Sequence, residues 1–191
     1  TSNPSAPIRF LNHWDNLDGT IERGYAGPSL FYAESSGEDW EITPHRDRVT
    51  DYARLLASIG INGCSLNNVN ADDRALSQEG IQKLATLADA LRVYGVQSLI
   101  SIRLNAPMSL GGLKTFDPLS PKVREWWHRK ACEVYDAIPD LAGWVLKADS
   151  EGSLGPTAYG RTHAQAANLL ADALEPQGGR IFYRGFVYNH K

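Results

Sequence analysis

Three ionisable side chains follow one another closely in the segment GWVLKADSE: Lys147, Asp149 and Glu151. The segment begins as an apolar run, and the alternation of a β-strand places Val145, Lys147 and Asp149 on one face. A lysine on the inner face of a sheet is costly to bury unless a carboxylate meets it, from the protein or from a ligand. Lys147 therefore either forms a structural ion pair with Asp149 or Glu151, or binds an anionic substrate beside an acid; we favour the second interpretation.

Arg184 is a second cation, on the next strand-like segment and at a similar height. The planar guanidinium of arginine suits a carboxylate or a phosphate, although a neighbouring acid of the protein would suit it as well. Glu151, in a pocket that partly excludes water, is a candidate general acid beside these cations.

Other polar and aromatic residues also follow strand-like runs. Trp14 either stacks on a sugar ring or closes one end of the fold, and Asn67, Asn68 and Asn70 either bind hydroxyl groups or form turns. We expect His13 to be an internal histidine with its hydrogen bonds satisfied. Cations, an acid, amides and a loop tryptophan together favour an acidic carbohydrate as the ligand.

The elements that must position these residues alternate between strand-like and helix-like patterns. The predicted strands are 8–13, 61–67, 96–104, 143–149 and 180–187, and the predicted helices are 45–59, 74–94, 121–138 and 158–174. Such alternation indicates βα units and a parallel sheet, either doubly wound or closed as a barrel. No GxGxxG or GxxxxGK[ST] motif supports a nucleotide site. Because a (β/α)₈ TIM barrel needs about 250 residues and eight units, five strands and four helices predict an incomplete barrel. The polar residues at the strand ends would then share one mouth.

The amino-acid composition narrows the classes of protein to which the chain can belong. The 191 residues are 42% hydrophobic and 21% charged, as in a globular domain, and a net charge of −3 argues against a nucleic-acid partner. No apolar run approaches the roughly 20 residues of a membrane span. Two distant cysteines and five histidines in no ligand spacing predict no metal and no cofactor, and the cysteines are expected to be free and partly buried. The first residues carry no signal-peptide pattern and read as part of a longer protein, so the cellular location stays open.

Longer strings of residues carry a resemblance to a known family. They are LNHWDNLDG (11–19), IERGYAG (21–27), DYARLLASIGING (51–63), NNVNA (67–71), GGLKTFDPL (111–119), KADSEG (147–152), YGRTH (159–163) and FVY (186–188). Through these strings the sequence, over essentially its whole length, resembles the α-glucuronidases of glycoside hydrolase family 67.

The resemblance implies a (β/α)₈ catalytic domain and a reaction on oligosaccharides derived from glucuronoxylan. The bond cleaved, with inversion, would be the α-1,2 bond between (4-O-methyl-)glucuronic acid and the terminal non-reducing xylose. Glu151 would be the general acid, and Lys147 and Arg184 would hold the uronate carboxylate. The residues implied around the uronic acid ring are Trp14, Asn68, Val69 and Asn70.

The sequence departs from the family in two respects. Ser153 and Leu154 replace the Gln-Pro that usually follows the acid loop, so the loop is expected to differ in shape. The second carboxylate that an inverting hydrolase needs is expected beyond Lys191, together with the helical region that carries the dimer contacts of a homodimeric parent. A family N-terminal β-domain is also expected outside the chain. The chain is therefore interpreted as a fragment of an α-glucuronidase; the alternative is a uronate-binding module without catalysis.

Overall fold

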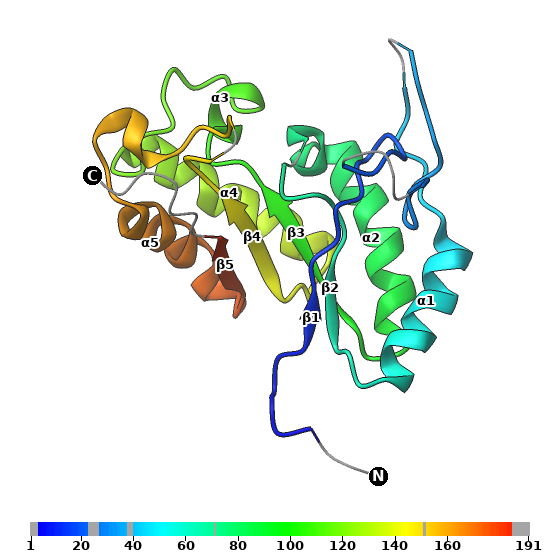
Figure 1. The fold of residues 1–191 in the computed structure, drawn as a ribbon. Coiled ribbons are helices and arrows are strands. Elements are labelled where there is room, and N and C mark those ends of the chain that lie inside the picture. The colour runs from blue at the N-terminus through cyan, green and yellow to red at the C-terminus, as the bar shows by residue number, and fades with distance from the viewer. Residues whose placement is uncertain (1–3, 23–26, 38–39, 71, 151, 185–191) are drawn as a thin grey trace.

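The computed structural model describes residues 4–22, 27–37, 40–70, 72–150 and 152–184. Its strands form one parallel sheet in which the spatial order equals the sequence order (Figure 1). The strands are β1 (Phe10–Leu11), β2 (Gly63–Ser65), β3 (Gln97–Ile102), β4 (Gly143–Lys147) and β5 (Arg180–Arg184). Because all five run in the same direction, their carboxyl ends meet at one edge of the sheet.

A layer of helices follows the strands along one side of the sheet (Figure 1). The α-helices are α1 (Arg46–Ser58), α2 (Gln78–Arg92), α3 (Ala106–Ser109), α4 (Pro121–Ala137) and α5 (His163–Leu174). Short 3₁₀ turns occupy Asp73–Leu76, Pro156–Tyr159 and Glu175–Gln177. The long helices contact one another in the order α1, α2, α4, α5, so each βα unit lies beside the next.

The two faces of β4 have different environments. Trp144 and Leu146 belong to the main core between sheet and helices, where the Trp144 ring lies 5.3 Å from that of Trp127 on α4. Val145 faces the other way, into a small apolar cluster to which no described helix contributes. The predicted alternation is therefore confirmed for Val145, and two neighbouring tryptophans of α4, Trp126 and Trp127, are buried in the same core as Trp144.

These features confirm the α/β class and a curled parallel sheet. Helices on one face only argue against the doubly wound alternative, in which both faces are covered. Within the described residues β1 and β5 are the two edges, so the sheet is open. The fold agrees with an incomplete barrel, whereas the predicted closure into a (β/α)₈ barrel is a property that these residues do not display.

The predicted helix 74–94 is wrong at its start. Asp73–Leu76 form a 3₁₀ turn, and α2 begins only after Ser77, whose hydroxyl accepts a hydrogen bond of 3.0 Å from the Gly80 amide. A Cβ atom on Gly80 would come within 1.9 Å of the Arg74 carbonyl oxygen. The turn can thus pack against the helix only because residue 80 is glycine.

The predicted helix 158–174 is also two elements. Gly160, with φ of +63°, ends the 3₁₀ turn, and Thr162 starts α5 through a capping box with Gln165. By contrast, Ser120 stands at the start of α4 but its side chain makes no capping bond.

The other predicted elements differ in their ends. The first four strands are shorter than predicted. The fifth is observed over Arg180–Arg184, and residues 185–187 of its predicted range lie outside the described residues. Both cysteines are free; Cys64 is buried, which raises the pKa of its thiol to about 12, whereas Cys132 is exposed rather than partly buried.

None of the helices in the described part of the chain is long and apolar enough to cross a membrane.

Candidate functional site

Two cations end neighbouring strands at the carboxyl edge of the sheet. Lys147 is the last residue of β4, and it stands in register with Arg184, the last residue of β5. Adjacent strands lie about 4.8 Å apart, so the two backbones present their side chains to one region. Lys147 is only 1% exposed, and both side chains interact with other groups of the chain. The register therefore brings the two cationic residues to neighbouring positions at the carboxyl edge of the sheet.

Asp149 does not lie where strand alternation predicts. The strand ends at Lys147, and Asp149 adopts a positive φ of 53°, which is uncommon for a residue other than glycine. Its carboxylate accepts hydrogen bonds from the hydroxyl and the amide of Thr157, the latter at 3.2 Å, and lies 3.8 Å from His163 Nε2. Asp149 thus fixes the loop between β4 and α5, in place of the predicted alignment with Val145 and Lys147.

Glu151, the proposed general acid, lies outside the described residues. The chain on either side of it is described: Ser150 and Ser153 form an antiparallel bridge, with a backbone bond of 2.9 Å. The same loop is tied to the start of α5 through Asp149 and Thr157. The described residues on both sides of position 151 therefore belong to the loop that follows β4.

Asn67 and Asn68 connect the ends of three strands. Asn67 is 1% exposed; its amide donates to the Ser101 carbonyl at 3.0 Å and its side-chain oxygen accepts from the Ser101 amide at 2.8 Å. The Asn68 side chain donates to Asn16 Oδ1 at 3.0 Å, and its backbone amide donates to the Asp15 carbonyl at 2.7 Å. Both asparagines hold the loops after β1 and β2 in place.

Glu22, which was not predicted to belong to the site, links Asn70 to Trp14. The side-chain amide of Asn70 donates to Glu22 Oε2 at 2.6 Å, and the backbone amide of Glu22 donates to the Trp14 carbonyl at 3.1 Å. Val69, between the asparagines, is buried in the inner apolar cluster with Val145. Glu22 and Asn70 are 48 positions apart, and no sequence pattern signals their contact.

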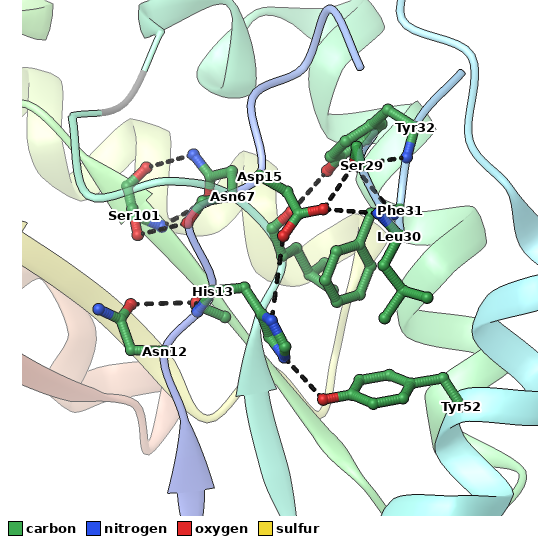
Figure 2. Close-up of polar contacts among 12 residues, drawn as sticks. Asn12, His13, Asp15, Ser29, Leu30, Phe31, Tyr32, Tyr52, Asn67 and Ser101 are labelled. Atoms are coloured by element: carbon green, nitrogen blue, oxygen red, sulfur yellow. Dashed lines mark hydrogen bonds and ion pairs between the residues drawn. The ribbon is translucent and has the colours of Figure 1, made fainter. Parts of the chain in front are cut away.

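A buried polar network supports the same edge from the helical side (Figure 2). The Asp15 carboxylate accepts from the Ser29 hydroxyl at 2.5 Å and from the Leu30 amide at 2.8 Å. His13 Nε2 lies 2.9 Å from the hydroxyl of Tyr52 on α1. His13 is thus a satisfied histidine as predicted, but its ring faces the helices. Burial lowers the pKa of His13, and the charge of Asp15, 3.9 Å away, opposes that change.

Two polar pockets lie at the carboxyl edge, and Asn70 and Arg103 line both of them. Their volumes are about 360 and about 290 Å³. Arg103 follows β3 directly in the chain, and only the fold shows that it lines both cavities. In the described part of the chain no group of three His, Cys, Asp or Glu side chains is arranged to hold a metal ion.

Comparison with known proteins matches the whole chain to one protein family. Residues 1–191 match the family model described as the glycosyl hydrolase family 67 middle domain. Probable α-glucuronidase A of Aspergillus oryzae is 50% identical over 190 residues, which are 100% of this chain and 22% of that protein. Alpha-glucuronidase A of Aspergillus tubingensis is 51% identical over 189 residues, 99% of this chain and 22% of that protein. The chain thus spans about a fifth of the length of these relatives.

Among solved structures, a family 20 exo-β-N-acetylglucosaminidase from Vibrio harveyi, in complex with N-acetylglucosamine, is similar in fold. Its TM-score is 0.53 at 11% sequence identity, over 95% of this chain and 36% of that one. At this identity the likeness concerns the fold alone.

Proposed function

The chain belongs to glycoside hydrolase family 67, whose middle domain it matches throughout, and on that basis we propose that it forms part of the active site of an α-glucuronidase. The reaction proposed is the hydrolysis, with inversion, of the α-1,2 bond between (4-O-methyl-)glucuronic acid and the terminal non-reducing xylose of xylo-oligosaccharides. The observation that carries this proposal is the pair of cations in register, Lys147 and Arg184, at the carboxyl edge that leads to Glu151.

The cations would bind the carboxylate of the uronic acid. An arginine fork and a lysine ammonium can both donate to one carboxylate and so distinguish a uronic acid from a neutral hexose. Trp14 and the segment Asn68–Asn70 would form the wall around the sugar ring. The hydrogen bonds of Asn68 to Asn16 and of Asn70 to Glu22 support this wall, because they hold it in one position.

Glu151 would protonate the oxygen of the departing xylose. An inverting hydrolase also needs a base about 6.5–9.5 Å from the acid, to activate water on the opposite face of the sugar. Asp15 already binds Ser29 and Leu30, and Asp149 already binds Thr157, which makes both poor candidates for that base. We therefore propose that the base comes from another part of the full-length protein.

The test uses the full-length protein with Glu151→Gln. We expect the variant to lose hydrolysis of aldouronic oligosaccharides, whose leaving group needs a proton, and to retain hydrolysis of an aryl glucuronide with an activated leaving group. Glu175→Gln, an exposed glutamate after α5, is the matched control and should behave as the parent.

Equal losses on both substrates would show that Glu151 is not the acid. If the parent binds uronates but releases no glucuronic acid from any oligosaccharide, the uronate-binding module is the correct alternative.

A further inference from the structure

Asp15 is a buried carboxylate in the loop that follows β1. Only 4% of the residue is exposed, and its Oδ1 accepts from the Ser29 hydroxyl at 2.5 Å and from the Leu30 amide at 2.8 Å (Figure 2). The other oxygen, Oδ2, lies 3.9 Å from His13 Nδ1. Burial of a carboxylate is costly unless donors meet it, and these two donors come from residues 14 and 15 positions further along the chain. The carboxylate therefore joins the loop after β1 to the segment 29–30.

The Ser29 side of this contact is itself held by the core. The Ser29 hydroxyl oxygen accepts from the amides of Phe31 at 3.0 Å and Tyr32 at 3.1 Å, and both of these residues are buried in the main core. The Ser29 carbonyl accepts from Arg48 Nη1 on α1 at 3.1 Å. The Asp15 carboxylate is therefore bonded to a segment that the core and the first helix hold in place.

The backbone of Asp15 supports residues of the proposed wall around the sugar ring. Its carbonyl accepts from the Asn68 amide at 2.7 Å, and it pairs with Ile21 in an antiparallel bridge. Trp14 and Asn16, on either side of it, are half-buried. Successive side chains of an extended segment point to opposite faces, so a fixed Asp15 carboxylate directs the side chains of Trp14 and Asn16 to the other face.

A carboxylate suits this task because a charged acceptor makes stronger hydrogen bonds than a neutral one. A group that is displaced by about 1 Å from its productive position loses much of its effect on a substrate, so a tight hold on the wall affects binding. The alternative is that Asp15 contributes to stability alone, as a buried hydrogen bond does anywhere in the fold. Both roles lower stability when the side chain is removed, but only the first changes the affinity for substrate.

We propose that Asp15 is a positioning residue for substrate binding, whose carboxylate holds Trp14 and the Asn68 segment in the orientation that receives the uronic acid ring. The proposal rests on the proposed function, because it takes Trp14 and Asn68 as parts of the wall around that ring. The Asp15 carboxylate is turned toward Ser29 and Leu30, so it acts through its neighbours in the chain and not on the sugar.

The first measurement is steady-state kinetics of the full-length protein on glucuronic acid linked to xylobiose. We expect Asp15→Ala to raise KM about tenfold with little change in kcat, because a misplaced wall weakens the binding of substrate and transition state alike. Asp15→Asn keeps an oxygen for both donors and should return KM to within about threefold of the parent. If Asp15→Ala does not fold, Ser29→Ala removes the same bond from its other side and should raise KM by about threefold or more.

Tyr135→Phe is the matched control for a loss of stability alone. The Tyr135 hydroxyl donates to the Leu141 carbonyl at 3.0 Å, in a buried bond before the start of β4 and thus at the opposite edge of the sheet. We expect both Tyr135→Phe and Asp15→Ala to lower the thermal unfolding midpoint, and KM to rise only in Asp15→Ala. An unchanged KM in Asp15→Ala, or in Ser29→Ala where that variant replaces it, would overturn the proposal. An equal rise of KM in Tyr135→Phe would do the same.

Fluorine NMR of the full-length protein labelled with fluorotryptophan separates this proposal from the proposed function. The Trp14 signal is the one that Trp14→Phe removes, and it reports on the indole without any substrate. We expect it to shift or broaden in Asp15→Ala and to keep its position in Asp15→Asn and Tyr135→Phe. A shifted signal in a protein that releases no glucuronic acid from any substrate would support the positioning role and refute the glucuronidase. Release of glucuronic acid, with the Trp14 signal and KM both unaffected by Asp15→Ala, would refute the positioning role and leave the glucuronidase intact.

Discussion

At the scale of single residues, Lys147 and Arg184 act as a pair, since β4 and β5 present them in register. Replacing either by alanine should mainly raise KM for uronate substrates, by about 10- to 100-fold, because a hydrogen bond between charged groups is lost. Turnover at saturation should change much less. Arg180→Ala, at the opposite end of β5, is the control on the same strand. Unchanged kinetics on uronates in both variants would remove the carboxylate-binding role.

His13 should make stability depend on pH. Burial holds the pKa of its folded state below the ordinary 6.5, so the unfolded chain binds a proton first as the pH falls. The contribution of His13 to the free energy of unfolding is therefore complete above about pH 6.5 and is lost below it. For one group, this free energy changes by at most about 1.4 kcal/mol per pH unit. The Asp15 carboxylate, 3.9 Å away, reduces the effect, and the Tyr52 hydroxyl is its other neighbour.

The measurement is denaturant unfolding of the full-length protein at several values between pH 7.5 and 5. His13→Gln should give a flatter dependence of the unfolding free energy on pH than the parent, and His128→Gln on α4 serves as the control substitution. A slope as steep in His13→Gln as in the parent would contradict this role.

At the scale of elements, α5 and α4 start in different ways. Thr162 Oγ1 accepts from the Gln165 amide at 3.2 Å and the Gln165 side chain accepts from the Thr162 amide at 2.9 Å, whereas Ser120 makes no such bond. Thr162→Ala should therefore cost about 0.5–2 kcal/mol of stability and Ser120→Ala markedly less. Thermal unfolding of both variants checks this; equal losses would show that the capping box contributes nothing.

At the scale of the whole molecule, the described sheet has two unpaired edges and an open apolar face. An apolar cavity of about 260 Å³ on that face is lined by Phe10, Leu99, Val145 and Phe182 among others. Exposed strand edges and apolar patches promote association. We expect the 191-residue chain, produced by itself, to self-associate with increasing concentration in sedimentation velocity, whereas the full-length protein gives one discrete species. A stable, monodisperse monomer of the short chain would contradict this.

The amino-acid sequence by itself determined the class and order of the elements. Alternation along β4 placed Val145 on the face that the structure shows, opposite Trp144, and the helix-like patterns located the helices. It also placed Lys147 and Arg184 at strand ends. These features are local, since they depend on residues within one or two turns of each other. The two helix starts were misplaced because 3₁₀ turns have nearly the same apolar spacing as helices.

Only the tertiary structure decided how the strand-end residues are used. In the tertiary structure Asp149 accepts a hydrogen bond from Thr157, and Asn67 is hydrogen-bonded to Ser101. Asn70 donates to Glu22, and Arg103 lines two pockets. Most of these contacts link residues 33 to 48 positions apart, and all depend on the paths of loops. Sequence periodicity carries no information about such paths, because a loop is positioned by what it packs against and not by its own repeat.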